Sequence, residues 1–307
     1  MIFRALCGLL LSAAAPFVGA QESPNPAAHT PIKVTFGTYA FRKPTEVFKQ
    51  FQPVTVELSR LLTAQLGETA TVELIVVKTY EECLDQFVKG KIDVVRLGPA
   101  SYVLAKERNP KVEILAAENE DSRNVGLIVV REDSPFQKLS DLAGKRFAFG
   151  DDQSTIGRFL SQAELVRAGV HANDLAQWKY LERHDIVFKA VEIGDYDAGA
   201  LHADTFKELN EKASTKLRVL HPFDNVRKPW IARAELEPRI ANAFRASLLA
   251  LKDAPALKAL KVPGFVAATD SDYELVRKGM QDVARFAPQK EDAPAAEPAP
   301  KPAPAKE

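Results

Sequence analysis

Short apolar runs alternate with longer amphipathic stretches along most of the chain, and this alternation constrains the fold more than any other sequence feature. The first half predicts, in order, a strand at 32–36, a helix at 45–66, a strand at 71–77, a helix at 80–89, a strand at 92–95, a helix at 100–108 and a strand at 112–116. Strands that alternate with helices predict a parallel sheet with helices on its faces. The sequence therefore predicts an α/β fold.

A second alternation of strands and helices begins near residue 126. It predicts strands at 126–131, 146–149, 178–181 and 197–200, with helices to about 168 and at 184–193. Residues 216–224 are expected to return the chain to the first unit, where two last helices close it. We predict two α/β lobes joined by two crossing strands, with lobe I formed by 31–126 plus 225–287 and lobe II by 127–224. Folds of this kind hold a small ligand in the cleft between the lobes.

The two ends of the chain differ from its folded part. Residues 1–20 carry one positive charge, at Arg4, then an apolar run and the sequence Val18-Gly19-Ala20, which is the three-part pattern of a secretory signal peptide cleaved after Ala20. A membrane anchor is the alternative, but the apolar run is short of the ~20 residues that span a bilayer. Residues 288–307 contain six prolines and six alanines, a composition that predicts a disordered tail. The mature protein is therefore expected in the periplasm.

The composition excludes several classes of protein. The 307 residues carry 41 basic and 41 acidic side chains, so the excess of positive charge that nucleic-acid binding requires is missing. Two cysteines exclude a disulfide scaffold and a cysteine-rich zinc module, and loss of the signal peptide leaves one, Cys83. Within its amphipathic helix, Cys83 is expected to be a buried small residue, not a nucleophile. We expect no cofactor, no metal and no enzymatic activity, and a monomer.

Eight short motifs occur in an order and spacing that together resemble a known family. They are Gly90-Lys91-Ile92-Asp93, Leu97-Gly98-Pro99-Ala100-Ser101-Tyr102, Asp133-Ser134, Leu139-Ser140-Asp141-Leu142-Ala143-Gly144-Lys145, Phe149-Gly150, Ser154-Thr155-Ile156-Gly157, His184-Asp185 and Gly194-Asp195-Tyr196-Asp197-Ala198-Gly199. Over residues 31–231 the chain resembles the phosphonate-, phosphite- and phosphate-binding proteins of ABC importers. The resemblance implies a type II periplasmic binding protein fold, a hinge between two lobes, and neither cofactor nor catalysis.

Ser154 and Thr155 are the strongest candidates for contact with an anion. They lie where a polar loop enters a helix, so that free backbone N–H groups, the positive end of the helix dipole and two hydroxyls can face one oxyanion. The alternative is that Ser154 is an N-cap alone. In the family this motif is Ser-Thr-Ser-Gly, and the resemblance adds Gly157 to the site. Here Ile156 replaces the third residue, so one hydroxyl is missing.

The resemblance supplies three further candidates. His184 opens its own helix where the family has a histidine that contacts the ligand, and Tyr80 matches a tyrosine whose hydroxyl reaches the ligand. Structural roles are the alternative for both. Tyr102 follows the Gly98-Pro99 turn, and its side chain either faces the cleft or packs in the core.

Charged residues stand where the family pattern is less charged. Arg96, Arg123 and Arg183 lie near the expected cleft, and each could equally be a solvated arginine. Together they favour a more highly charged anion, because guanidinium groups bind phosphate or carboxylate through two hydrogen bonds. Asp204 and Asp224 fall near positions where amino-phosphonate binders meet the ligand's ammonium group, although Asn225 follows Asp224 where the family has a proline. If Asp204 faces the cleft, a ligand amine or a protonated oxyanion is favoured, and the alternative is that Asp204 is a surface charge.

These features predict an exported solute-binding protein. It would close two lobes over a small oxyanion such as phosphonate, phosphite or phosphate, and pass it to the permease of an ABC transporter. A protein of the same fold that reports its ligand to a membrane sensor kinase is the alternative. A third possibility, an exported hydrolase, would need a nucleophile that the sequence does not provide.

Overall fold

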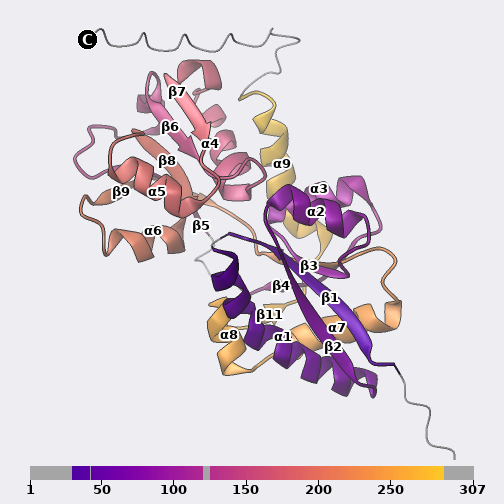
Figure 1. The fold of residues 1–307 in the computed structure, drawn as a ribbon. Coiled ribbons are helices and arrows are strands. Elements are labelled where there is room, and N and C mark those ends of the chain that lie inside the picture. The colour runs from indigo at the N-terminus through magenta and orange to yellow at the C-terminus, as the bar shows by residue number, and fades with distance from the viewer. Residues whose placement is uncertain (1–29, 42, 120–124, 287–307) are drawn as a thin grey trace, which may run out of the picture. The chain divides into compact units, whose positions relative to one another are not determined.

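Two β-sheets organise the part of the chain that the computed structural model describes, residues 30–41, 43–119 and 125–286 (Figure 1). The predicted signal peptide, Arg123 and the Pro/Ala-rich tail lie outside these residues. The first sheet contains β1 (Ile32–Tyr39), β2 (Ala70–Val77), β3 (Val94–Arg96), β4 (Glu113–Glu118), β10 (Pro229–Ala232) and β11 (Phe265–Val266). The second contains β5 (Val125–Arg131), β6 (Arg146–Phe149), β7 (Gln177–Tyr180), β8 (Ala198–His202) and β9 (Leu217–Asp224).

Both sheets are mixed, whereas the sequence pattern predicted a parallel sheet in the first lobe. In the first sheet the order is β11-β4-β10-β3-β1-β2, and β1 pairs in parallel with β2 and β3. β10 runs antiparallel to both β3 and β4, because the chain enters this sheet from the other lobe when it forms β10. In the second sheet, ordered β7-β6-β8-β5-β9, the entering strand β5 is likewise antiparallel to β8 and β9. Local periodicity detects a strand and carries no information on its direction.

Helices cover both faces of each sheet. The first lobe has α1 (Pro44–Leu66), α2 (Tyr80–Val88), α3 (Pro99–Arg108), α7 (Pro238–Ala250) and α8 (Ala254–Leu260). The second has α4 (Ser161–Arg167), α5 (His184–Glu192) and α6 (Ala203–Asn210), with short helices η1 (Leu139–Leu142), η2 (Thr155–Leu160) and η3 (Ala172–Asp174). Local sequence sets the ends of α1, which begins with Pro44 in its first turn and ends at Gly67 with φ 70°.

Each lobe has two apolar cores, one on each face of its sheet. In the first lobe, one core packs β1 and β10 against α1 and α7, where the rings of Phe36 and Trp230 stack with centroids 4.3 Å apart. The core on the opposite face involves α2 and α3. In the second lobe, the cores lie between the sheet and α4 on one face and α5 with α6 on the other. The two lobes are thus separately packed layers that can hold a site between them.

The C-terminal helices contact both lobes. They are η4 (Asp270–Tyr273) and α9 (Glu274–Val283), and Figure 1 shows α9 beside α4 and α3. Tyr273 is buried in a core of the first lobe, whereas Phe286 is buried in a core of the second and its carbonyl accepts a hydrogen bond from Ala172 N–H at 2.8 Å. The end of the range expected in lobe I therefore packs on lobe II. Within the described ranges, no helix is both long and apolar enough to cross a bilayer.

Candidate functional site

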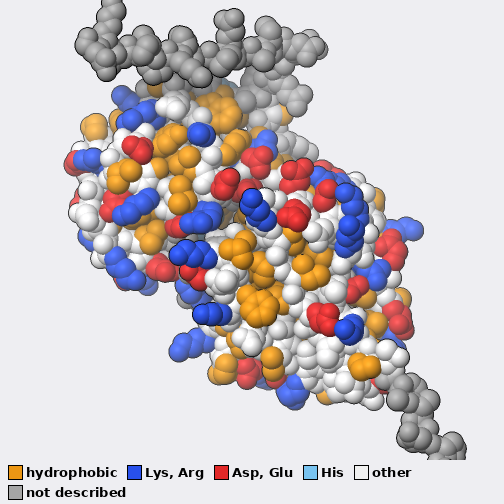
Figure 2. Space-filling view, in the orientation of Figure 1, with side chains coloured by type: hydrophobic (Ala, Val, Ile, Leu, Met, Phe, Trp, Pro, Cys, Tyr) orange, Lys and Arg blue, Asp and Glu red, His pale blue; other side chains and the backbone are white. Residues whose placement is uncertain are grey.

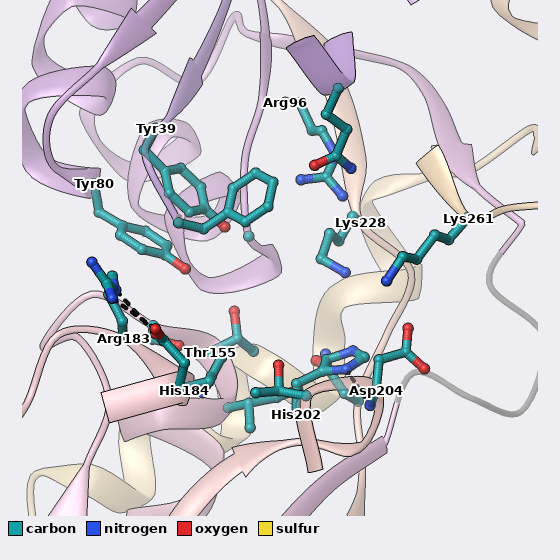
Figure 3. Close-up of a pocket in the computed structure, with 18 of the residues that line it drawn as sticks. Tyr39, Tyr80, Arg96, Thr155, Arg183, His184, His202, Asp204, Lys228 and Lys261 are labelled. Carbon is teal, nitrogen blue, oxygen red and sulfur yellow. Dashed lines mark hydrogen bonds and ion pairs between the residues drawn. The ribbon is translucent and has the colours of Figure 1, made fainter. Parts of the chain in front are cut away.

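A cavity of about 370 Å³ lies between the two lobes, and both contribute to its lining. From the first lobe come side chains at the ends of β1 and β3, at the beginning of α1 and α2, and around β10. From the second come the beginnings of η2, α5 and α6. The lining includes Tyr39, Phe41, Lys43, Tyr80, Arg96, Ser154, Thr155, Arg183, His184, Asp185, His202, Asp204, Glu208, Lys228 and Lys261, and Figure 3 shows many of these residues.

Ser154 and Thr155 are fixed by hydrogen bonds of different kinds. Ser154 is the N-cap of η2, because its Oγ accepts from Gly157 N–H at 3.0 Å. Thr155 Oγ1 accepts from Ala100 N–H of the first lobe at 2.9 Å. Since the Thr155 oxygen accepts across the cleft, its own hydroxyl proton remains to be donated. Both side chains are buried from bulk solvent and line the cavity. Ser154 is therefore an N-cap, as expected, and is also part of the cavity wall.

Gly157 is needed for packing and is not part of the cavity lining. A Cβ at this position would lie 2.7 Å from Gly150 Cα, and Gly150 N–H donates to the Gly157 carbonyl at 2.8 Å. The close approach brings the loop after β6 against the beginning of η2. This segment is a π-helix, a rare form that occurs often at functional sites. Gly157, which was expected to contact the ligand, thus allows the loop after β6 to pack against η2 and does not line the cavity.

Two tyrosines of the first lobe stack against each other at the cavity. Tyr39 ends β1, Tyr80 begins α2, and their ring centroids are 3.6 Å apart with an interplanar angle of 26°. Burial raises the pKa of Tyr39 and raises that of Tyr80 well above its usual value. Both side chains therefore remain phenols at neutral pH and can donate hydrogen bonds. Figure 3 shows the two rings extending toward Thr155 from the opposite wall.

His184 and His202 lie at the beginning of two helices of the second lobe. His184 is the first residue of α5, and its Nδ1 is buried without a hydrogen-bond partner. Burial, followed by the charge of Lys228, lowers the pKa of His184 to about 4. His202 caps α6, where its Nδ1 accepts from Asp204 N–H at 3.1 Å, and burial and Lys228 lower its pKa well below the usual value. Both imidazoles are therefore neutral at neutral pH.

Arg96 lines the cavity as part of a buried ion pair. Its guanidinium donates to both carboxylate oxygens of Glu118, at 2.5 and 2.9 Å, and lies over the Phe41 and Phe51 rings. Glu118 also accepts from Trp230 Nε1 at 3.0 Å. Burial alone would raise the pKa of Glu118, but the charge and hydrogen bonds of Arg96 outweigh it and lower the pKa to about 2. The positive charge of Arg96 is thus balanced within the protein.

With this geometry in place, comparison with known proteins assigns the family. A family model described as the periplasmic substrate-binding protein of the phosphonate ABC transporter matches residues 36–273. The chain belongs to this family. Its members are transport proteins and not enzymes, and the match supports the predicted transport role over a role as a ligand sensor for a membrane kinase.

Named relatives and solved structures agree with the assignment. The chain is 26% identical over 237 residues to the probable phosphite-binding protein PhnD1 of Prochlorococcus marinus, which covers 73% of this chain and 77% of the relative. It is 25% identical over 304 residues to the phosphate-import protein PhnD of Mycolicibacterium smegmatis, and this alignment covers 89% of this chain and 92% of the relative. The structure of PhnD1 with methylphosphonate aligns with TM-score 0.72 at 23% identity over 83% of this chain and 100% of that one. The structure of the sulphonate-binding protein SsuA of Escherichia coli aligns with TM-score 0.56 at 16% identity, and this alignment covers 91% of this chain and 98% of SsuA. These structures share the predicted type II periplasmic binding protein fold.

Most of the candidate residues that were named from the sequence line the cavity. Tyr80, Arg96, Ser154, Thr155, His184 and Asp204 are all part of its wall. Arg183 also lines the cavity, but it donates to both carboxylate oxygens of Asp185 at 3.0 and 2.7 Å. Of the three candidate arginines, the two that the structure describes, Arg96 and Arg183, therefore both pair with carboxylates. This pairing weakens the argument from arginines for a more highly charged anion.

Tyr102 lies away from the cavity. Its hydroxyl donates to Asp270 Oδ1 at 2.5 Å and its ring packs beside Tyr273. Burial and the Asp270 carboxylate raise its pKa. Of the two orientations that the sequence left open, the structure shows the packed one. Asp224, the other acidic candidate, is exposed at the end of β9 and is not in the lining.

Cys83 is buried in α2, as expected of a small residue in an amphipathic helix. Burial raises the pKa of its thiol to about 12, so the reactive thiolate is scarce at neutral pH. Among residues 30–41, 43–119 and 125–286, no group of three or more His, Cys, Asp or Glu side chains is arranged to hold a metal ion.

Sequence reasoning missed Tyr39, His202, Lys228 and Lys261. Tyr39 and His202 end strands β1 and β8, and ligands of open α/β sheets bind at the carboxyl ends of strands, so this rule would have found both. Lys228 precedes the returning strand β10, and Lys261 ends α8. Neither lysine has a local motif that distinguishes it from a surface lysine.

Proposed function

We propose that the cavity binds a phosphorus oxyanion, such as phosphonate, phosphite or phosphate, and that the protein delivers it to the membrane permease of an ABC importer. The observation that carries this proposal is the position of Thr155. Its side chain lies at the beginning of a helix, accepts a hydrogen bond from the opposite lobe and retains a proton to donate. A ligand held here would be bound by both lobes at once.

The surrounding groups support an acceptor-rich ligand. The Tyr39 and Tyr80 phenols supply hydroxyl protons, and the backbone N–H groups of Thr155 and His184, the first residues of η2 and α5, have no partner within their helices. Helix N-termini favour negative charge. The protein thus offers mainly neutral donors to the anion. The names of the relatives agree, since they refer to phosphite, phosphate and methylphosphonate.

The Thr155→Val variant tests the proposal. Valine keeps the shape of threonine and removes the hydroxyl, so the affinity for methylphosphonate, phosphite or phosphate should fall about 10-fold or more, as for loss of a hydrogen bond to a charged group. Isothermal titration calorimetry of the purified protein measures this, with ethanesulfonate as a comparison ligand. Thr71→Val, at an exposed position of β2, is the matched control and should bind like the parent. Unchanged affinity of Thr155→Val, or binding of ethanesulfonate alone, would contradict the proposal.

We further propose that the protein is exported by a signal peptide at residues 1–20 and acts in the periplasm as a monomer. The periplasmic role of the family supports this location. Sequencing the N-terminus of the protein from the periplasmic fraction should begin at Gln21, and light scattering should give the mass of one chain. An N-terminus that still begins at Met1 would contradict cleavage of the signal peptide, and the mass of two chains would contradict the monomer.

We also propose that the two lobes predicted from the sequence, with the residues around Phe286 belonging to lobe II instead of lobe I, close on the ligand as two bodies. Closure would bring Tyr80 toward Ser154, Thr155 and His184 and exclude water from the site. The hydrogen bond from Ala100 to Thr155 is a contact of the kind that closure would form. Small-angle X-ray scattering should show a smaller radius of gyration when ligand is added, and an unchanged radius would argue against closure.

A further inference from the structure

The cavity extends well beyond the space that one phosphorus oxyanion fills. Its volume is about 370 Å³, whereas a water molecule in the liquid takes ~30 Å³, so the cavity corresponds to roughly a dozen waters. Pockets of ~300–1,000 Å³ enclose much larger ligands than phosphite. If the oxyanion lies at Thr155 and the two tyrosines, the remaining space extends past His202 to Lys261. A ligand with a substituent on phosphorus would fill it.

Three cations from different elements of the first lobe converge on this second part of the cavity. Arg96 ends β3, Lys228 precedes β10 and Lys261 ends α8. Figure 3 shows Lys228 and Lys261 directed into the cavity across from His202 and Asp204. After burial, the charge of Lys228 acts most strongly to lower the pKa of His202, and Arg96 and Lys261 act in the same direction. The same lysine also lowers the pKa of His184, so its field extends along the cavity.

The acidic groups nearby balance these cations in part. Glu118 pairs with Arg96 and is also stabilised by the charge of Lys228, and Glu208 lies 3.4 Å from Lys261. Asp204 lines the same part of the cavity, and an ammonium group on the ligand would have to bind there. Such a group would lie in the field of Lys228, which repels it. A negative group directed toward Lys228, and away from Asp204, would be attracted by this lysine and would meet the uncharged His202 opposite.

We propose that the ligand carries a second anionic group on its phosphorus substituent, and that Lys228 selects it at the end of the cavity near His202. The ligand class is therefore a phosphonocarboxylate or a related compound with two separated anionic groups, and not an aminoalkylphosphonate. This inference rests on the proposed function, because it takes the phosphorus group to lie at Thr155. It adds a residue that determines specificity and assigns a chemical class to the substituent.

The test compares three probes that differ in the second group. Methylphosphonate has none, phosphonoacetate carries a carboxylate, and 2-aminoethylphosphonate carries an ammonium. Calorimetry on the parent protein should show phosphonoacetate binding at least about 10-fold more tightly than methylphosphonate, with 2-aminoethylphosphonate the weakest. Lys228→Gln should remove the advantage of phosphonoacetate, so that it weakens the binding of phosphonoacetate at least about 10-fold more than the binding of methylphosphonate.

Two more variants keep the result interpretable. Lys212→Gln removes an equal charge from an exposed position outside the cavity lining and should leave the order of the three probes unchanged. Lys261→Asn, at a helix end with φ 59° that asparagine tolerates, should reduce the advantage of phosphonoacetate less than Lys228→Gln does, and it remains informative if the latter fails to fold.

The outcomes separate this proposal from the proposed function. If 2-aminoethylphosphonate binds as tightly as phosphonoacetate or more tightly, the proposed site for a second anionic group is wrong. Binding of methylphosphonate would still support the proposed function. Equal weakening of all probes by Lys228→Gln would overturn it as well, because Lys228 would then act on the phosphorus group itself. Failure of all three probes to bind, together with phosphite and phosphate, would refute the proposed function.

Discussion

The two lobes contribute to the same cavity by different physical means. The second lobe presents groups held by the backbone, namely a capping serine, a threonine at a π-helical turn and two neutral histidines at helix N-termini. The first lobe presents long side chains, which are two stacked tyrosines, a buried arginine and two lysines. The difference suggests that the second lobe provides general affinity for an oxyanion, whereas the first lobe adds selection through charge.

The buried pair of Arg96 and Glu118 is where the first lobe is most vulnerable. Arg96→Met would leave the Glu118 carboxylate buried without its cation, which typically costs ~3–5 kcal/mol of stability. Urea unfolding monitored by circular dichroism measures this loss. Arg183→Met is the matched control, because its pair with Asp185 is partly exposed and should cost less than ~1 kcal/mol.

A double variant shows whether the uncompensated charge causes the loss. Adding Glu118→Gln to Arg96→Met removes the buried charge and keeps an acceptor for Trp230, so part of the stability should return. Equal costs for the two arginine variants, or no recovery in the double variant, would contradict the contrast between a buried charged pair in the first lobe and an exposed pair in the second.

Features encoded in a few neighbouring residues could be predicted from the sequence, whereas features that depend on long-range contacts could not. Ser154, Thr155 and His184 were recognisable because a cap and a helix start are encoded within a few residues. The alternation of strands and helices was equally local. In contrast, Arg96 finds its carboxylate 22 residues away, and the direction of β10 depends on a chain that returns from the other lobe. Pairing and strand direction therefore had to come from the structure.

The histidines of the second lobe predict a dependence of stability on pH. His184 has a folded pKa of about 4, below the ordinary value of 6.5, so the unfolded chain binds more protons between these values. Stability from this group is therefore present above about pH 6.5 and is lost as the pH falls toward 4. His184→Gln should reduce that loss, on the order of 1 kcal/mol at pH 4.5 for a half-buried group.

Urea unfolding of both proteins at pH 4.5, 5.5 and 7 checks the prediction. The comparison must be made between variant and parent at each pH, because Asp151 acts in the opposite direction. Burial raises its pKa to about 6, so its contribution to stability is lost as the pH rises through that value. Parallel pH profiles for variant and parent would show that His184 is not the neutral, half-buried group that distinguishes the second lobe.

The smallest expected effect concerns single hydroxyls of the first lobe. Tyr39→Phe removes a phenol that faces the cavity, so the affinity for methylphosphonate should fall about 2-fold to 10-fold, which corresponds to ~0.5–1.5 kcal/mol for one hydrogen bond. Tyr102→Phe removes a phenol of the same lobe that donates to Asp270 outside the cavity, and should leave that affinity unchanged. Titration calorimetry compares the two. If both variants bind like the parent, the tyrosine pair serves to pack the first lobe and the neutral donors of the second lobe carry the oxyanion alone.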